Sequence, residues 1–100
     1  MAVYFGEIET FPNAKPDKAQ VMKILEECAE VYSAWESLEG ARCDPRTCNC
    51  RCSRCVLDEC ADVVQAVANL VAAIGVHNFT FFVEECERRN RKRGRYEPGA

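Results

Sequence analysis

The chain has 100 residues, 48% of them apolar or cysteine, and a formal net charge of −3 at pH 7. This length allows one domain at most, with a core so small that we expect a partner subunit, in a homodimer or homotetramer. The sequence has no long uncharged apolar run, so no transmembrane helix is expected. No basic region followed by an apolar run opens the sequence, so no signal peptide is expected. These absences predict a cytoplasmic protein without a membrane partner.

The charge is divided unevenly along the chain. Residues 1–87 hold fifteen acidic and seven basic side chains, whereas residues 88–95 hold six basic ones. Phosphate backbones attract positive charge, so the acidic body argues against nucleic acid as a partner. Cations are more suitable ligands for this acidic body than nucleic acids are.

Residues 1–15 include Gly6, Pro12 and Asn13 and lack periodicity, which predicts a loop with a short extended piece at 3–8. Pro16 and Asp17 are typical of a helix start. Over 17–38 the apolar residues recur at helical spacing, which predicts one amphipathic helix that Gly40 ends. The stripe consists of Val21, Ile24, Leu25, Cys28, Val31, Tyr32 and Trp35.

Residues 41–54 form a connection rich in Cys and Arg, which predicts a loop. A second helix is expected from Ser53 or Arg54 to Ile74, closed by Gly75. Apolar residues cover nearly its whole circumference, as in a buried helix at the centre of a bundle.

Asn78 is expected to cap a third helix over 79–91, which continues into a basic tail at 88–100. The predicted fold is therefore all-α: a single domain over residues 1–100, built as a bundle of about three helices and completed by oligomerisation.

Acidic motifs occur in both longer helices. The first is E-E-x-x-E at Glu26, Glu27 and Glu30, and the second is E-x-x-D at Glu59 and Asp62. Residues three apart share a helix face, so the carboxylates of each motif project together. The first motif is equally compatible with a solvated polar face.

The second motif interrupts an apolar helix, where it shares a polar arc with Gln65 and Asn69. Burying an unpaired carboxylate costs roughly several kcal/mol, and a divalent cation removes that penalty. Two facing helices that each supply an acidic pair can bind a hard cation, Mg²⁺ or alternatively Mn²⁺. Neither motif contains the histidine that is usual in di-iron sites, and His77 is expected in a loop.

The stretch K-I-L-E-E-C-A-E-V at 23–31, followed by E-C-A-D-V-V at 59–64, resembles the MazG-like all-α nucleoside triphosphate pyrophosphohydrolases. That superfamily is identified by E-E-x-x-E followed by E-x-x-D, and the resemblance covers 17–74. It implies cleavage of a nucleoside or deoxynucleoside triphosphate into the monophosphate and pyrophosphate. It also implies a metal site with Glu26 as a further ligand or base. The implied Mg²⁺ ligands are Glu27, Glu30, Glu59 and Asp62.

Phosphoryl transfer requires charge neutralisation and an aligned water. We expect Glu26 or Glu30 to orient that water as the catalytic residue. Phosphate-binding side chains are expected at Lys23, one turn before Glu27, and in the basic run at Arg91, Lys92 and Arg95. A purely solubilising role for the basic run is an equal alternative. Tyr32 and Trp35 fit the apolar stripe better than a role in stacking on a base.

Cysteines cluster in the 41–54 connection and at the start of the second helix, in numbers sufficient for tetrahedral Zn²⁺. The candidate zinc ligands are Cys43, Cys48, Cys50, Cys52 and Cys55. Only Cys52 and Cys55 have the usual C-x₂-C spacing, so a reduced loop is the main alternative. Cys28 and Cys60 are expected to be small core residues.

Two alternatives to this hydrolase remain open. One is a non-catalytic helical interaction module stabilised by zinc or another metal. The other is a phosphoribosyl-ATP pyrophosphohydrolase, which looks similar but usually has an aromatic residue and a histidine after E-x-x-D. Here Val64, Gln65 and Ala66 occupy that stretch, so this alternative ranks lower.

Overall fold

The computed structural model describes residues 1–47 and 51–99. Regular structure in these ranges consists of α1 (Lys18–Gly40), α2 (Arg51–Ile74) and α3 (Thr80–Lys92). The prediction of an all-α fold with three helices is confirmed. The extended piece expected at 3–8 forms no strand.

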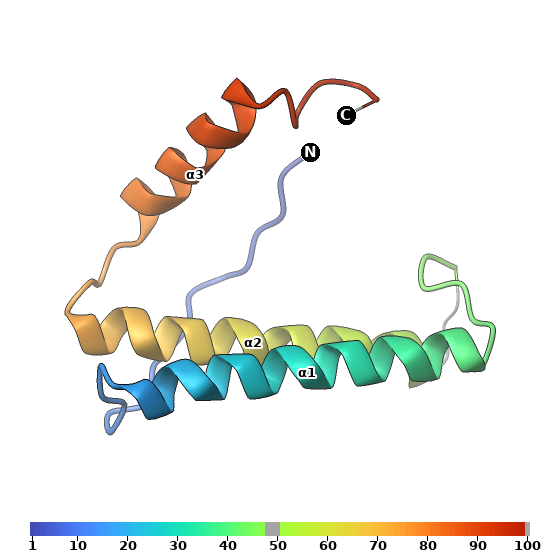
Figure 1. Cartoon of the computed structure of the whole chain (residues 1–100), viewed down its shortest axis with the longest axis horizontal. Coiled ribbons are helices and arrows are strands. Elements are labelled where there is room, and N and C mark those ends of the chain that lie inside the picture. The colour runs from blue at the N-terminus through green and yellow to red at the C-terminus, as the bar shows by residue number, and fades with distance from the viewer. Residues whose placement is uncertain (48–50, 100) are drawn as a thin grey trace.

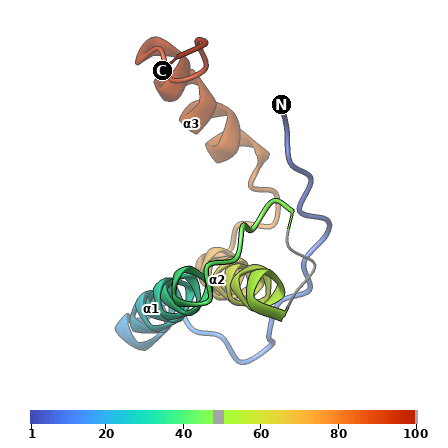
Figure 2. The ribbon, with the colours of Figure 1, turned by 90° about the vertical axis from the view of Figure 1, so that its right-hand side faces the viewer.

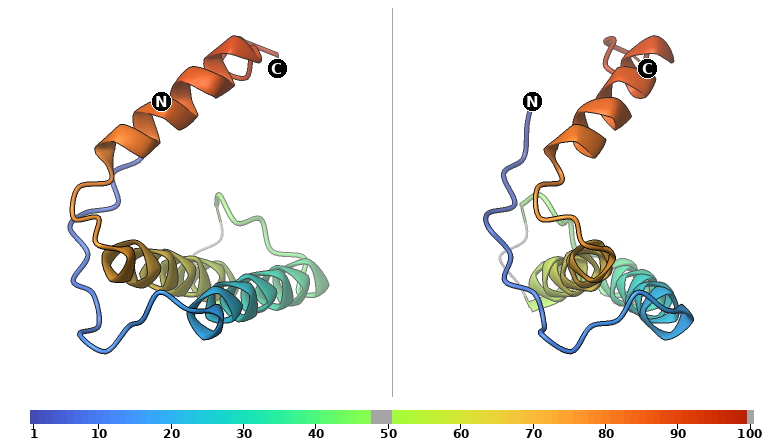
Figure 3. Two further views of the ribbon diagram at one scale, coloured as in Figure 1. Left: turned by 60° about the vertical axis from the view of Figure 1, so that its left-hand side comes forward. Right: turned by 90° about the vertical axis from the view of Figure 1, so that its left-hand side faces the viewer.

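The helices α1 and α2 lie side by side and run antiparallel as a long hairpin (Figure 1). The third helix, α3, leaves the C-terminal end of α2 and projects away from the hairpin (Figures 1 and 3). Within the described residues, α3 packs against neither α1 nor α2. No described helix has the length and apolarity that crossing a membrane requires.

The start of α1 agrees with the sequence prediction. Asp17 is the N-cap, and its Oδ1 accepts a hydrogen bond of 3.0 Å from the backbone N–H of Gln20. The predicted end differs, because Gly40 remains helical and Arg42 adopts the left-handed conformation, with φ 56°. The N–H of Cys43 then donates to the carbonyl of Leu38, which closes the helix.

The second helix begins at Arg51, slightly before the predicted start, and ends at Ile74 as predicted. Gly75 has φ 104°, which side chains disfavour, and the N–H of Val76 donates back to the carbonyl of Val71. In α3 the N-cap is Phe79 rather than Asn78. The Oδ1 of Asn78 still accepts a hydrogen bond from the N–H of Thr80.

The face of α1 that contacts α2 includes only Ile24 and Val31 of the predicted apolar stripe. Glu27 and Leu38 are buried, with 8% and 1% exposed, whereas Leu25 and Tyr32 are 58% and 65% exposed. The rest of the stripe is rotated away from α2, because the contact face is centred on a neighbouring helical row. The expected core positions of Tyr32, Trp35 and Cys28 are therefore wrong for a single chain. The contact row consists of Gln20, Ile24, Glu27, Val31, Ala34 and Leu38.

The prediction that α2 is buried all round is also wrong for a single chain. Among its described side chains only Ala66 and Asn69 are buried, and Leu57, Cys60 and Ile74 are exposed. The physical reason is that α2 is covered only by α1 on one side and by residues 1–16 on another.

Residues 1–16, the N-terminal segment, pass along α2 on the side away from α1 and cross beneath it to reach the start of α1 (Figure 2). Asn69 holds this segment, because its Oδ1 accepts a 2.9 Å hydrogen bond from the N–H of Phe11. Gln65 donates through Nε2 to the carbonyl of Glu9 at 2.9 Å and to Asn69 Oδ1 at 3.0 Å. Side-chain amides of α2 thus replace the strand partners that this segment lacks.

Candidate metal centre

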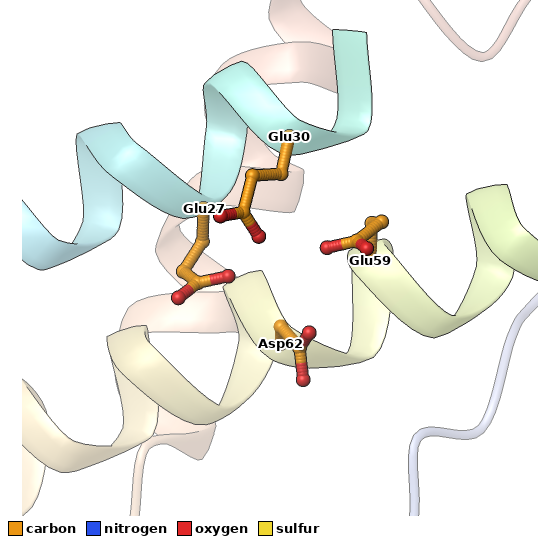
Figure 4. A group of neighbouring side chains, drawn as sticks. All are labelled: Glu27, Glu30, Glu59 and Asp62. Carbon is orange, nitrogen blue, oxygen red and sulfur yellow. The ribbon is translucent and has the colours of Figure 1, made fainter. Parts of the chain in front are cut away.

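Four carboxylates from the two antiparallel helices point toward one another midway along the hairpin (Figure 4). Glu27 and Glu30 come from α1, and Glu59 and Asp62 come from α2. One oxygen of each lies within 4.8 Å of one oxygen of each of the others. The structure therefore brings together all four acids that the two motifs singled out.

The local sequence explains this convergence. Glu27 belongs to the row of α1 that contacts α2, and Glu30 follows one turn later on the same side. On α2, Asp62 lies one turn and Glu59 two turns before the buried Ala66. Because both pairs border the seam of the hairpin, their carboxylates meet where the helices face each other.

The cluster, defined as these four carboxylates, is closed on one side and open on the other. Glu27 is buried and Glu59 is half-buried, whereas Glu30 and Asp62 are exposed. The Oε2 atom of Glu59 is buried and has no hydrogen-bond partner. A buried carboxylate oxygen without a partner is costly unless a cation or a proton is nearby.

The acids also change the protonation of one member. The pKa of Glu30 is raised above its ordinary value of 4.5, first through a hydrogen bond with Glu59 and then through the negative charge of Glu27. Protonation of Glu30 thus reduces the repulsion among the four carboxylates, as a bound divalent cation would.

Lys23 supplies the positive charge closest to Glu27. Its Nζ lies 3.0 Å from Glu27 Oε1 and 3.6 Å from Glu26 Oε2. The hydrogen bond with Glu27 is the main reason why the pKa of Lys23 is raised above 10.5. This ammonium stands at the edge of the cluster, where it can meet a phosphate or compete with a cation.

The donor set fits a hard divalent cation. With Mg–O distances of about 2.0–2.1 Å, oxygens on opposite sides of one ion are about 4.2 Å apart, so small side-chain movements would close the cluster around it. Four carboxylates match the preference of Mg²⁺ and Mn²⁺ for oxygen ligands. The exposed side leaves room for waters or phosphate oxygens.

The other predicted site residues are placed differently. The side chain of Glu26 is 62% exposed and pairs with Lys23 instead of joining the cluster. Arg91 and Lys92 lie on α3, Arg95 follows it, and α3 packs against neither helix of the hairpin. Arg91 instead lies over the Tyr96 ring, 4.9 Å from its centre. One chain therefore does not bring its basic run to its own carboxylates.

The predicted zinc ligands can be compared only in part. Cys43 is half-buried and Cys55 is exposed. The side chains of Cys48, Cys50 and Cys52 lie outside the part of the chain that the structure describes. His77 lies in the connection between α2 and α3, as predicted.

Sequence reasoning missed two residues that shape the surroundings of the site. Gln65 and Asn69 were placed on the polar arc of the acids, but their amides bind the backbone of the N-terminal segment. The signal that could have identified them is their chemistry: amides, unlike carboxylates, both donate and accept, as an extended backbone requires.

No protein-family model matches the chain, and comparison with curated proteins and with solved structures likewise gives no significant match. The case for a function therefore depends on the residues of the cluster themselves.

Proposed function

We propose that this chain is a Mg²⁺-dependent nucleotide pyrophosphohydrolase of the MazG-like type, which cleaves a nucleoside or deoxynucleoside triphosphate to the monophosphate and pyrophosphate. The observation that carries the proposal is the meeting of four carboxylates from two helices, with oxygens within 4.8 Å of one another. The buried Oε2 of Glu59 supports a cation there, because no group of the described residues donates a hydrogen bond to it.

Glu27, Glu30, Glu59 and Asp62 would hold the cation. When bound, Mg²⁺ supplies charge neutralisation for the triphosphate and acidifies a nearby water. The open side of the cluster, at Glu30 and Asp62, is where phosphate oxygens can approach.

Glu30 is the better candidate for the base. Unlike Glu26 it belongs to the cluster, and it lies on the exposed side, where a water and a phosphate can approach. The water oxygen attacks the α-phosphorus, its proton passes to the Glu30 carboxylate, and the bond from the α-phosphorus to the bridging oxygen breaks. Pyrophosphate leaves with that electron pair.

Lys23 is the candidate for binding a phosphate within one chain. Its side chain is more than half exposed while it pairs with Glu27, so it can turn toward an anion beside the cluster. A lysine at this position would favour the negatively charged substrate without taking part in the proton transfer.

The test is pyrophosphate release from a panel of ribonucleoside and deoxyribonucleoside triphosphates with Mg²⁺. We expect Glu59→Gln and Asp62→Asn each to lower activity by at least about 100-fold. Loss of a partner that only orients a metal ligand already costs about 10–100-fold, and these residues are the proposed ligands themselves. The matched control is Asp58→Asn, an exposed acid on the same helix that is outside the cluster. It should keep full activity.

Calorimetric titration with Mg²⁺ separates binding from turnover. Wild-type protein should bind the ion, and Glu59→Gln should bind it much more weakly while its circular dichroism remains helical. Equal activity of Asp58→Asn and Asp62→Asn, or turnover that persists in a chelator, would contradict the proposal.

A non-catalytic helical module stabilised by a metal is the second candidate. The observation that favours it is the large amount of exposed apolar surface on α1 and α3. Metal binding at the cluster without turnover of any nucleotide would support this candidate over the hydrolase.

A further inference from the structure

A hydrogen bond joins α1 to α2 near the end of the hairpin where α1 begins. The side-chain amide of Gln20 donates through Nε2 to the backbone carbonyl of Ala66 at 3.1 Å. Outside the carboxylate cluster, no other hydrogen bond links these two helices within residues 1–47 and 51–99. Gln20 is half-buried and Ala66 is buried, so this bond lies in the seam of the hairpin.

Both partners of the bond belong to well-fixed backbone. The N–H of Gln20 donates to Oδ1 of the N-cap Asp17 at 3.0 Å, which holds Gln20 in the first turn of α1. Ala66 lies in the interior of α2, where its carbonyl also accepts the N–H four residues later. A bond between two fixed points determines how far one helix is displaced along the other.

The spacing of these residues relates the bond to the cluster. Glu27 comes seven residues after Gln20 in α1, and Glu59 comes seven residues before Ala66 in α2. Seven residues make nearly two turns and about 10.5 Å of helix, so each pair shares a face of its own helix. Because α1 and α2 run antiparallel (Figure 1), the two steps point the same way. The bond that holds Gln20 against Ala66 therefore also determines how Glu27 lies relative to Glu59.

The cluster does not tolerate a change in this register. A slip of one helical turn moves the acids of α1 by about 5.4 Å relative to those of α2. This displacement exceeds the 4.8 Å within which the four carboxylate oxygens now lie. The apolar contacts of the seam resist such a slip only weakly, because burial of apolar surface is non-directional. A polar side chain between two helices, by contrast, specifies their register, as it does in coiled coils.

We propose that Gln20 is a positioning residue of the carboxylate cluster. Its hydrogen bond to Ala66 fixes the register of α1 against α2 at which the four acids converge. The inference rests on the proposed metal site, but Gln20 itself contacts neither the cation nor the nucleotide. Without the bond both helices persist, because the Ala66 carbonyl keeps its helical partner, and the carboxylates no longer meet.

Binding of Mn²⁺ alone to the full chain, followed by the electron paramagnetic resonance of the free ion, tests this role. Gln20→Met keeps the length of the side chain, removes the donor and suits a helix. We expect it to bind Mn²⁺ at least about tenfold more weakly than the wild type, as loss of an orienting partner does in metal sites. The matched control is Ser37→Ala, which removes a side-chain donor to the Ser33 carbonyl within α1. It should bind Mn²⁺ as the wild type does.

Nuclear Overhauser contacts in the metal-free protein report the register independently of any ion. The wild type should show contacts between the side chains of the α1 acids and those of the α2 acids. Gln20→Met should lose them while its circular dichroism remains helical. If Gln20→Met keeps both these contacts and the wild-type affinity, the positioning role is overturned and the metal site stands. If the wild type shows the contacts but binds no Mn²⁺, the hydrolase proposal fails, and loss of the contacts in Gln20→Met still supports the positioning role.

A second variant covers the case in which Gln20→Met fails to fold. Gln20→Lys keeps a donor of similar reach, and its added charge, about 10 Å along the helix from Glu27, is largely screened at 0.15 M salt. It should retain the contacts between the acids and the affinity of the wild type for Mn²⁺. A folded Gln20→Lys protein without those contacts would show that the hydrogen bond does not fix the register.

Discussion

At the residue scale, the cluster makes the metal-free protein sensitive to pH through Glu30. Glu59 and Glu27 raise the pKa of Glu30 above 4.5, so the folded chain holds this proton more tightly than the unfolded chain does. The resulting stabilisation is complete below pH 4.5 and is lost as the pH rises through the raised pKa. In a chelator, the wild type should therefore lose stability over a pH range that rises from below 4.5 through the raised pKa of Glu30.

Replacing Glu30 with Gln should weaken this loss, because the amide is neutral at both ends of the range. The urea midpoint, measured in a chelator across the range, reports it. Saturating Mg²⁺ should also remove the loss in the wild type, since the cation takes over the role of the proton. Glu36→Gln, at an exposed acid of α1 outside the cluster, is the control. If its pH profile and that of Glu30→Gln are identical, Glu30 does not carry this effect.

Lys23 is expected to have opposite effects on the cation and on the substrate. Its ammonium lies 3.0 Å from Glu27 Oε1, so it competes with a metal ion for that carboxylate. Lys23→Met should lower the Mg²⁺ dissociation constant and raise the KM for the nucleotide. Titration calorimetry and steady-state kinetics measure the two quantities. Lys18→Met, at an exposed lysine in the first turn of α1, should change neither. If Lys23→Met changes neither the Mg²⁺ dissociation constant nor the KM, Lys23 contributes to binding of neither the cation nor the nucleotide.

The four acids of the cluster were predictable because a spacing of three fixes a shared helix face whatever the tertiary structure. The division of roles among them was not. That Glu27 is buried while Glu26 points outward depends on how far α1 is rotated against α2, which no local pattern determines.

At the element scale, the boundaries followed from local chemistry. Asp17 caps α1, and Gly75 provides the left-handed turn after α2. Both effects act within a few residues, so the sequence predicts them well. The face with which α1 packs against α2 could not be predicted in the same way. An apolar stripe indicates that some element covers it, but it does not identify that element. In the single chain the row containing Glu27 and Leu38 packs against α2, whereas the apolar side chains of Leu25, Tyr32 and Trp35 remain exposed.

The N-terminal segment is the element whose position depends most on one side chain. Asn69 is 4% exposed and accepts the N–H of Phe11 at 2.9 Å. Asn69→Leu has similar volume but leaves that N–H unpaired, so we expect a loss of about 1–3 kcal/mol in the free energy of unfolding. We also expect the N-terminal segment to detach from α2. Faster proteolytic cleavage N-terminal to Pro12 would measure this detachment.

The control for this variant is Asn90→Leu, because the Asn90 side chain bonds only to Cys86 and Arg95, in α3 and just after it. Its rate of cleavage before Pro12 should equal that of the wild type. Slow cleavage in Asn69→Leu would mean that the apolar contacts of residues 5–8 with α2, and not the amide, hold the segment.

At the scale of the whole molecule, the uneven distribution of charge gains a structural meaning. The acidic residues lie mainly on and around the hairpin, and the basic ones end in a helix that packs against neither of its own helices. Apart from the ion pair between Arg88 and Glu85 within α3, the basic segment 88–95 forms no salt bridge with the acidic residues in the described part of the chain. In the dimer expected from the sequence, the basic segment of one copy could lie near the acidic hairpin of the other.

Reversing charges on α3 should therefore weaken the dimer without disturbing the hairpin. Arg89 and Lys92 are exposed, and neither side chain forms a salt bridge or a hydrogen bond within the described residues. The double change Arg89→Glu and Lys92→Glu should raise the dimer dissociation constant about tenfold, since each exposed pair contributes up to about 1 kcal/mol. The difference from the wild type should shrink as salt screens the charges. Lys15→Glu with Lys18→Glu, the same reversal at the start of α1, is the control for net charge. Equal weakening by both pairs would show that net charge alone, and not the basic segment, governs association.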